Sequence, residues 1–180
     1  PGDRRATTQN LLADVLSRDL TSRLDRRLDI EEKAATQIWA MADFQGRYPG
    51  LLVIHARPLE GFTNEQVERM IWEELAGVIS RPVTAEKLKE ITDSRRKRFF
   101  RELATNAGLA EFLVQGQSVY GDWHGPLRVL ESEPTVTVEE VTALARELFR
   151  ADQASVVMVE PEEPAAAAEA GARGAAEPAG

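Results

Sequence analysis

Leucines recur at every fourth position through the first part of the chain. This spacing places them on one face of a helix, where they form a core-facing stripe. The pattern predicts a helix that begins at Thr7 or Thr8 and ends in the charged stretch 29–33. The stripe consists of Leu12, Leu16, Leu20, Leu24 and Leu28.

Two strands are predicted next, because apolar and polar residues alternate over 35–44 and again over 51–59. The turn-forming residues at 45–50 lie between them, so we expect an antiparallel hairpin. One face of each strand is apolar and should pack on the core. The opposite face becomes polar toward its end and should open onto solvent or a cavity. Its residues are Trp39, Met41, Val53, His55 and Arg57.

A series of helices is predicted after the hairpin. Thr63 and Thr137 each begin a capping box, and Thr84 begins a further helix just after Pro82. The apolar run 153–160 predicts a last strand. The resulting order is α-β-β-α-α-α-α-β, which is an α+β fold with an antiparallel sheet and helices packed on one face. Three strands are few for this many helices, so we expect one more strand upstream of Pro1.

The composition changes after residue 160. Residues 1–160 contain the regular apolar patterns and are expected to form one domain. Residues 161–180 are Ala, Glu, Gly and Pro with a single Arg, and they carry no bulky apolar side chain. Such a segment cannot bury enough apolar surface to fold, so it is predicted to be a disordered tail.

Charge and composition exclude several kinds of function. The net charge of −8 argues against binding nucleic acid through general electrostatics. No apolar run approaches the roughly 20 residues that span a membrane. The chain has no cysteine, so thiolate zinc sites are excluded. There is also no nucleophile elbow and no glycine-rich phosphate loop.

The candidate catalytic side chains have structural interpretations. The two histidines, His55 and His124, have no partner at the spacing of H-E-x-x-H or H-x-x-E-H. His55 is interpreted as a residue of the open sheet face and His124 as a surface turn residue. The basic run 95–98 is interpreted as a solvated helix face, with a docking surface as the alternative. We therefore predict no catalytic residue and no metal ligand in this chain.

Six short stretches follow one another in the order of a known family. They are S-R-L-D-R-R-L at 22–28, the passage 31–42 into the first strand, P-V-T-A-E-K-L at 82–88, G-D-W at 121–123, V-T-V-E-E-V at 136–141 and V-E-P at 159–161. This succession resembles the second half of a repeat of the insulinase/pitrilysin-type zinc metallopeptidases, a type shared with mitochondrial processing peptidase.

The resemblance implies a place in a larger enzyme. In such peptidases, two halves built of these repeats enclose an unfolded peptide, and the first repeat carries H-x-x-E-H and a distal glutamate that hold and use zinc. This chain would then be a non-catalytic C-terminal repeat of a zinc-dependent metalloendopeptidase. It would bind no zinc itself, since the zinc would lie in the parent or partner repeat. It would pack on that zinc-bearing repeat and form the chamber wall that contacts peptide substrates.

Two departures from the family pattern matter. Family members often carry an Arg and, seven residues later, a Tyr that touch substrate, whereas Asp29 and Thr36 stand at the matching positions here. A catalytically inactive relative that acts as a scaffold or partner subunit therefore stays open as an alternative. The family repeat also begins with a strand upstream of the position of Pro1. We expect this chain to be the end of a longer protein.

Overall fold

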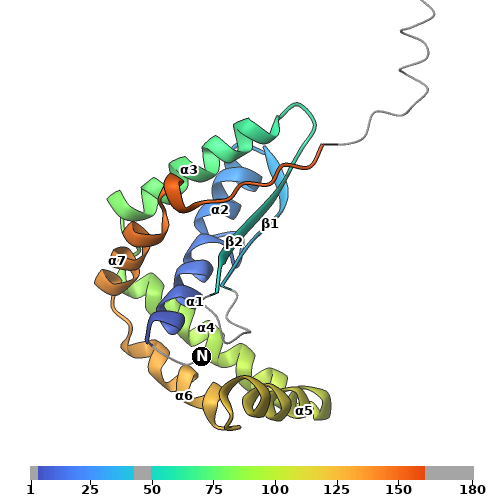
Figure 1. The fold of residues 1–180 in the computed structure, drawn as a ribbon, viewed down its shortest axis with the longest axis vertical. Helices are drawn as coiled ribbons and strands as arrows, with labels where there is room; N and C mark the ends of the chain where they lie inside the picture. The colour runs from blue at the N-terminus through green and yellow to red at the C-terminus, as the bar shows by residue number, and fades with distance from the viewer. Residues whose placement is uncertain (1–3, 43–49, 161–180) are drawn as a thin grey trace, which may run out of the picture.

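The computed structural model describes residues 4–42 and 50–160. Helices pack on one face of a two-stranded antiparallel sheet, so the fold is α+β as predicted (Figure 1). The strands are β1 (Ala35–Ala42) and β2 (Leu52–Pro58). The α-helices are α1 (Arg4–Leu16), α2 (Arg23–Asp25), α3 (Asn64–Ser80), α4 (Ala85–Leu103), α5 (Asn106–Gln115), α6 (Gly125–Ser132) and α7 (Val138–Leu148). Two π-helical turns, η1 (Arg26–Glu31) and η2 (Gly116–Tyr120), and two 3₁₀ turns, η3 (Glu133–Thr135) and η4 (Ala151–Gln153), complete the order.

Helix α1 lies at the centre of the core. Its residues Leu11, Leu12 and Leu16 are fully buried. The helix contacts β1 on one side and α4 and α7 on others, and Figure 1 shows it between the hairpin and the outer helices. The inner face of the hairpin completes this core. Burial of these apolar side chains therefore joins the sheet to the helices and fixes which face of the hairpin stays open.

The predicted continuous leucine helix is broken in the structure. Helix α1 ends at Leu16, and α2 begins only at Arg23. In between, the hydroxyl of Ser22 accepts hydrogen bonds from the amides of Arg18 and Asp19, each at 3.1 Å. These side-chain bonds give the backbone an alternative to the helix. Leu20 consequently points outward and is 61% exposed, whereas Leu24 and Leu28 are fully buried.

The helix starts predicted after the hairpin are confirmed. Thr63 and Thr137 each accept the amide hydrogen bond of a full capping box, and Thr84 caps α4 by accepting from the amide of Lys87. The predicted helix beginning at Thr84 runs to Leu103. A cap is a local arrangement of four residues, which is why it can be recognised without knowing the tertiary structure.

The predicted last strand at 153–160 is wrong. Residues 151–153 form the 3₁₀ turn η4, and residues 154–160 belong to no strand, so the sheet of the described residues has two strands rather than three. A strand needs a neighbour to complete its backbone hydrogen bonds. Here a side-chain bond from Asn64 Nδ2 to the carbonyl of Val159 (3.4 Å) joins this segment to the start of α3. The end of the first predicted strand, most of the turn at 45–50 and the tail 161–180 lie outside the described residues.

Candidate functional site

The open face of the hairpin gathers the five residues predicted to form it. Residue pairing places Trp39 opposite His55 and Met41 opposite Val53, while Arg57 lies opposite Thr36. Trp39 and Met41 are 41% and 49% exposed. The alternate residues face the other way and pack on the core: Ile38, Ala40, Leu52, Ile54 and Ala56. The predicted alternation of open and core-facing residues is therefore confirmed, while a role of the open face in binding stays a prediction.

A stacked pair of rings lies on this open face. The rings of Trp39 and His55 are 5.1 Å apart, centre to centre, and nearly parallel at 7°. Each ring therefore covers part of one face of the other. Stacked aromatic groups of this kind combine a large apolar area with few rotatable bonds, so they cost little entropy when they bind a partner.

A bulge in β1 orients the histidine. The regular register is interrupted between Thr36 and Trp39, where Gln37 has a φ of 51°. The carbonyl of Gln37 lies 2.9 Å from His55 Nδ1, which must carry the proton that this oxygen accepts. Nε2 is then the ring nitrogen left for another partner. Alternation along the strand could not reveal this bulge, since it depends on a left-handed residue that is not glycine.

The second histidine belongs to a turn and not to this face. His124 directly precedes α6, and Asp122 Oδ1 lies 2.9 Å from His124 Nδ1 and accepts from its backbone amide at 3.0 Å. The Arg128 guanidinium and these two bonds hold the pKa of Asp122 well below its usual range. His124 is exposed, as its interpretation as a surface turn residue predicted. Asp122 thus fixes the turn before α6.

The described residues do not fit a zinc ion. Across residues 4–42 and 50–160, no three His, Asp or Glu side chains gather closely enough to hold a metal. A structural zinc site needs four ligands and a catalytic one needs three. No hydrolytic step through a metal is derived from this chain.

In the same described ranges, no helix has the length and apolar character needed to cross a membrane.

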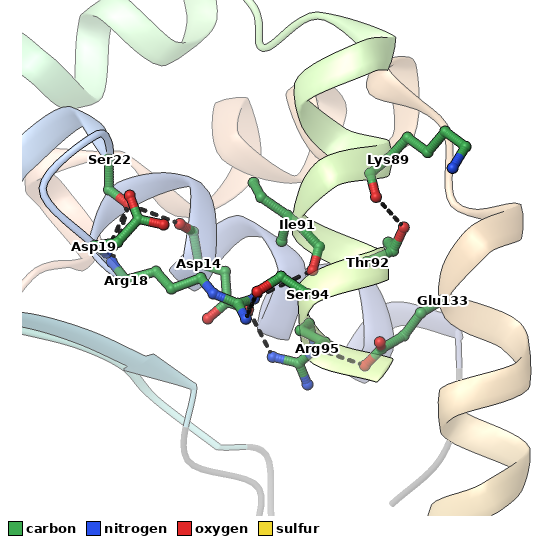
Figure 2. A network of polar contacts seen from close by, with 10 residues as sticks. All are labelled: Asp14, Arg18, Asp19, Ser22, Lys89, Ile91, Thr92, Ser94, Arg95 and Glu133. Atoms are coloured by element: carbon green, nitrogen blue, oxygen red, sulfur yellow. Dashed lines mark hydrogen bonds and ion pairs between the residues drawn. The ribbon is translucent and has the colours of Figure 1, made fainter. Parts of the chain in front are cut away.

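A buried polar network lies between α1, α4 and the start of η3 (Figure 2). The Arg95 guanidinium lies between two carboxylates, with Nη1 2.8 Å from Asp14 Oδ2 and Nε 2.8 Å from Glu133 Oε1. Arg18 also pairs with Asp14 at 2.9 Å and donates to the hydroxyl of Ser94 at 2.8 Å. The network therefore connects α1, α4 and η3 through charged side chains that are largely removed from water.

This network corrects the interpretation of the basic run at 95–98. Arg96, Lys97 and Arg98 are exposed as predicted, but Arg95 turns inward. Its partner Glu133 is only 2% exposed, and burial raises the pKa of that carboxyl group. The sequence signal was present in the helical position of Arg95, four residues after the buried Ile91 on the same face. The uniform charge of the run concealed it.

The chain was compared with family models, with curated proteins and with solved structures, and only the solved structures match its fold. No protein-family model matches the chain, and no curated protein matches it by sequence. Among solved structures, a protease from Helicobacter pylori superimposes with a TM-score of 0.76 at 17% identity, over 84% of this chain and 36% of that one. A protein of Bordetella pertussis Tohama I assigned as a zinc protease gives 0.71 at 18% identity, over 84% and 83%. The chain shares the fold of these two proteins.

A third structure with this fold is described as inactive. It is the inactive peptidase domain of a protein of Bordetella parapertussis assigned as a zinc protease. The TM-score is 0.74 at 17% identity, over 91% of this chain and 88% of that domain. By contrast, this chain spans only about a third of the length of the Helicobacter pylori protease chain. At these identities the likeness concerns the fold.

Proposed function

We propose that this chain is a non-catalytic C-terminal repeat of a zinc-dependent metalloendopeptidase of the insulinase/pitrilysin type. Its role is to form part of the wall of a substrate chamber and to pack on the zinc-bearing repeat of the same parent chain or of a partner subunit. The zinc belongs to that other repeat. The observation that carries the proposal is an exposed aromatic sheet face on a zinc-protease fold whose described residues contain no metal-binding group.

The open hairpin face suits an extended peptide. Trp39 and Met41 offer apolar surface, which gains about 25 cal/mol for each Å² that a peptide covers. His55 Nε2 and the Arg57 guanidinium lie on the same face. Because Nδ1 carries the proton, Nε2 of the neutral ring can accept a hydrogen bond from a peptide amide, while Arg57 can donate to peptide carbonyls or carboxylates. The contacts are few and not specific for one side chain. Such a surface would hold unfolded peptides of varied sequence, as a chamber wall requires.

A second exposed apolar surface would serve contact with the zinc-bearing repeat. It lies on and beside α5, at the opposite end of the molecule from α3 in Figure 1. Exposed apolar side chains grouped in this way are typical of surfaces that another domain covers. The surface consists of Phe100 (50% exposed), Leu109 (45%), Leu113 (42%), Val114 (67%) and Trp123 (45%).

The alternative is a catalytically inactive relative that acts as a scaffold or partner subunit. Asp29 and Thr36 occupy the positions where family members often touch substrate, and one of the structures with this fold is an inactive peptidase domain. The two hypotheses predict different open reading frames around this chain. An open reading frame that encodes H-x-x-E-H together with this chain favours the peptidase repeat, and a frame without that motif favours the scaffold.

Peptide binding to the isolated chain tests the proposed role directly. The measurement is fluorescence anisotropy of a fluorescein-labelled, unstructured peptide of about 20 residues, titrated with the chain in the presence of a metal chelator. Substitution Trp39→Ser should weaken binding about tenfold or more, because an exposed aromatic anchor is lost without disturbing the core. The matched control Trp123→Ser removes another exposed tryptophan, away from the hairpin, and should leave binding unchanged.

Three results would contradict the proposal. Equal binding by the Trp39→Ser and wild-type chains would remove the open face from the site. Cleavage of the peptide by the isolated chain would show that it carries its own catalytic residues. Stoichiometric zinc found in the purified chain by metal analysis would contradict the assignment of zinc to another repeat.

A further inference from the structure

A cavity of about 540 Å³ lies on the helical side of the molecule. It is bounded by α2 and η1, by the C-terminal end of α3 and by the start of α4, and none of the five open-face residues lines it. Five of its lining residues are cationic: Arg23, Arg26, Arg27, Arg81 and Lys87. We call it the arginine cavity. Such a concentration of positive charge is unexpected in a chain whose net charge is −8.

Most of the carboxylates that line the arginine cavity pair with arginines other than Arg23 and Arg81. Three acidic residues line it. Asp14 is held by Arg18 and by Arg95, at 2.9 and 2.8 Å, and Glu31 by Arg26 at 2.7 Å. The third is Glu74, whose Oε2 lies 3.8 Å from Arg23 Nη1, near the outer limit of an ion pair. Glu74 is therefore the carboxylate of the arginine cavity that partly balances the charge of Arg23.

Two guanidinium groups converge beside Gly77. A Cβ built at Gly77 would lie 3.3 Å from Arg81 Nη2 and 3.4 Å from Arg23 Nη1, so the absence of a side chain lets both groups approach α3. Arg23 also donates to the backbone carbonyl of Arg81, which keeps it in place. Within the described part of the chain, Arg81 makes no side-chain ion pair. Burial lowers the pKa of Arg23, Glu74 opposes this shift, and the nearby Arg81 adds to it to a lesser degree.

The start of α4 adds to the positive character of the arginine cavity. Thr84, Val83 and Lys87 line the cavity, and Thr84 caps a helix of 19 residues. The Thr84 hydroxyl accepts from the amide of Lys87. The amides before it have no partner within the helix and carry a partial positive charge. Two guanidinium groups and a helix start around one hollow are a common way to hold an anion.

We propose that the arginine cavity binds the oxyanion group of a small molecule, a phosphate or a carboxylate, between Arg23 and Arg81 at the start of α4. The bound group would bring a closer negative charge to both guanidinium groups than Glu74, whose Oε2 lies 3.8 Å from Arg23 Nη1. The site is independent of the hairpin face, so a ligand there would act on the stability of the helical half of the domain rather than compete with peptide.

Calorimetric titration of the full 180-residue chain with inorganic phosphate and, separately, with citrate tests this site. Ionic strength is held constant with sodium chloride, so that general screening is the same throughout. Substitution Arg81→Gln should weaken binding of the preferred anion about tenfold or more, because a bidentate charged contact is lost. The matched control is Arg146→Gln, which removes an exposed arginine of α7 outside the cavity and should change binding less than twofold.

A second variant protects the test against misfolding. In Gly77→Ala, the new Cβ would press on the flexible ends of Arg23 and Arg81, so anion binding should weaken while the circular dichroism spectrum stays unchanged. Tighter binding of phosphate than citrate identifies a phosphate site, and the reverse order a carboxylate site. The proposal is overturned if neither anion binds the wild-type chain in the low millimolar range, or if Arg81→Gln and Arg146→Gln weaken binding equally.

Discussion

Leu20 and Leu24 occupy successive positions of the same leucine stripe, yet they have opposite environments. Leu20 is 61% exposed in the turn after α1, whereas Leu24 in α2 is completely buried. The difference arises because the Ser22 hydroxyl and the Asp19 carboxylate bond to nearby backbone amides and end the helix between the two leucines. A short polar side chain thus decides which leucines belong to the core.

Substitution of each leucine by alanine should separate these environments. Leu24→Ala should lower the free energy of unfolding by about 2–5 kcal/mol, because it removes buried methyl groups and leaves a cavity. Leu20→Ala serves as the matched control and should change it by about 0.5 kcal/mol or less. The measurement is urea unfolding followed by circular dichroism. Similar losses for the two variants would mean that the helix continues through residues 17–22.

At the scale of the elements, the range of an interaction decided what could be predicted. The caps at Thr63, Thr84 and Thr137 depend on four neighbouring residues and are confirmed. The open face of the hairpin followed from a period of two, which needs only the burial of the opposite face. The prediction of a strand at 153–160 was wrong because an apolar run does not show whether a neighbouring strand is available to pair with it. The sequence did not predict that Arg95 turns inward, because its partner Glu133 lies 38 residues away.

The segment 154–160 leads to a prediction about hydrogen exchange. Val157 and Val159 are 85% and 81% exposed, and the segment forms no ladder with the described strands. Its amides should exchange at nearly the rate of an unfolded chain, whereas the amides of β2 that pair with β1 should be protected. Exchange followed by mass spectrometry at two protein concentrations provides the measurement. Protection of 155–159 that grows with concentration would contradict this, since it would show pairing with a second copy.

At the scale of the whole molecule, the Asp14–Arg95–Glu133 network connects elements that are far apart in the sequence. Asp14 lies in α1, Arg95 in α4 and Glu133 at the start of η3, and their contacts fix the position of α4 against the central helix (Figure 2). Within the described ranges, Glu133 Oε2 has no hydrogen-bond partner, so the stability of this carboxylate depends strongly on Arg95. A buried charge left without its partner is strongly destabilising.

Removal of Arg95 should therefore make stability depend on pH. Burial, the largest effect, raises the pKa of Glu133 and Arg95 opposes that rise. A folded-state pKa above the unfolded value means that Glu133 favours folding at low pH and loses this contribution as pH rises through the folded value. In Arg95→Met the opposing charge is gone, so the loss of unfolding free energy should be about 3–5 kcal/mol at pH 7.5 and clearly smaller at pH 5. Urea unfolding at both pH values measures it, with Lys97→Met as the control for loss of an exposed cation on the same helix. An equal loss at the two pH values would show that Arg95 stabilises the fold through packing of its side chain rather than through the charge of Glu133.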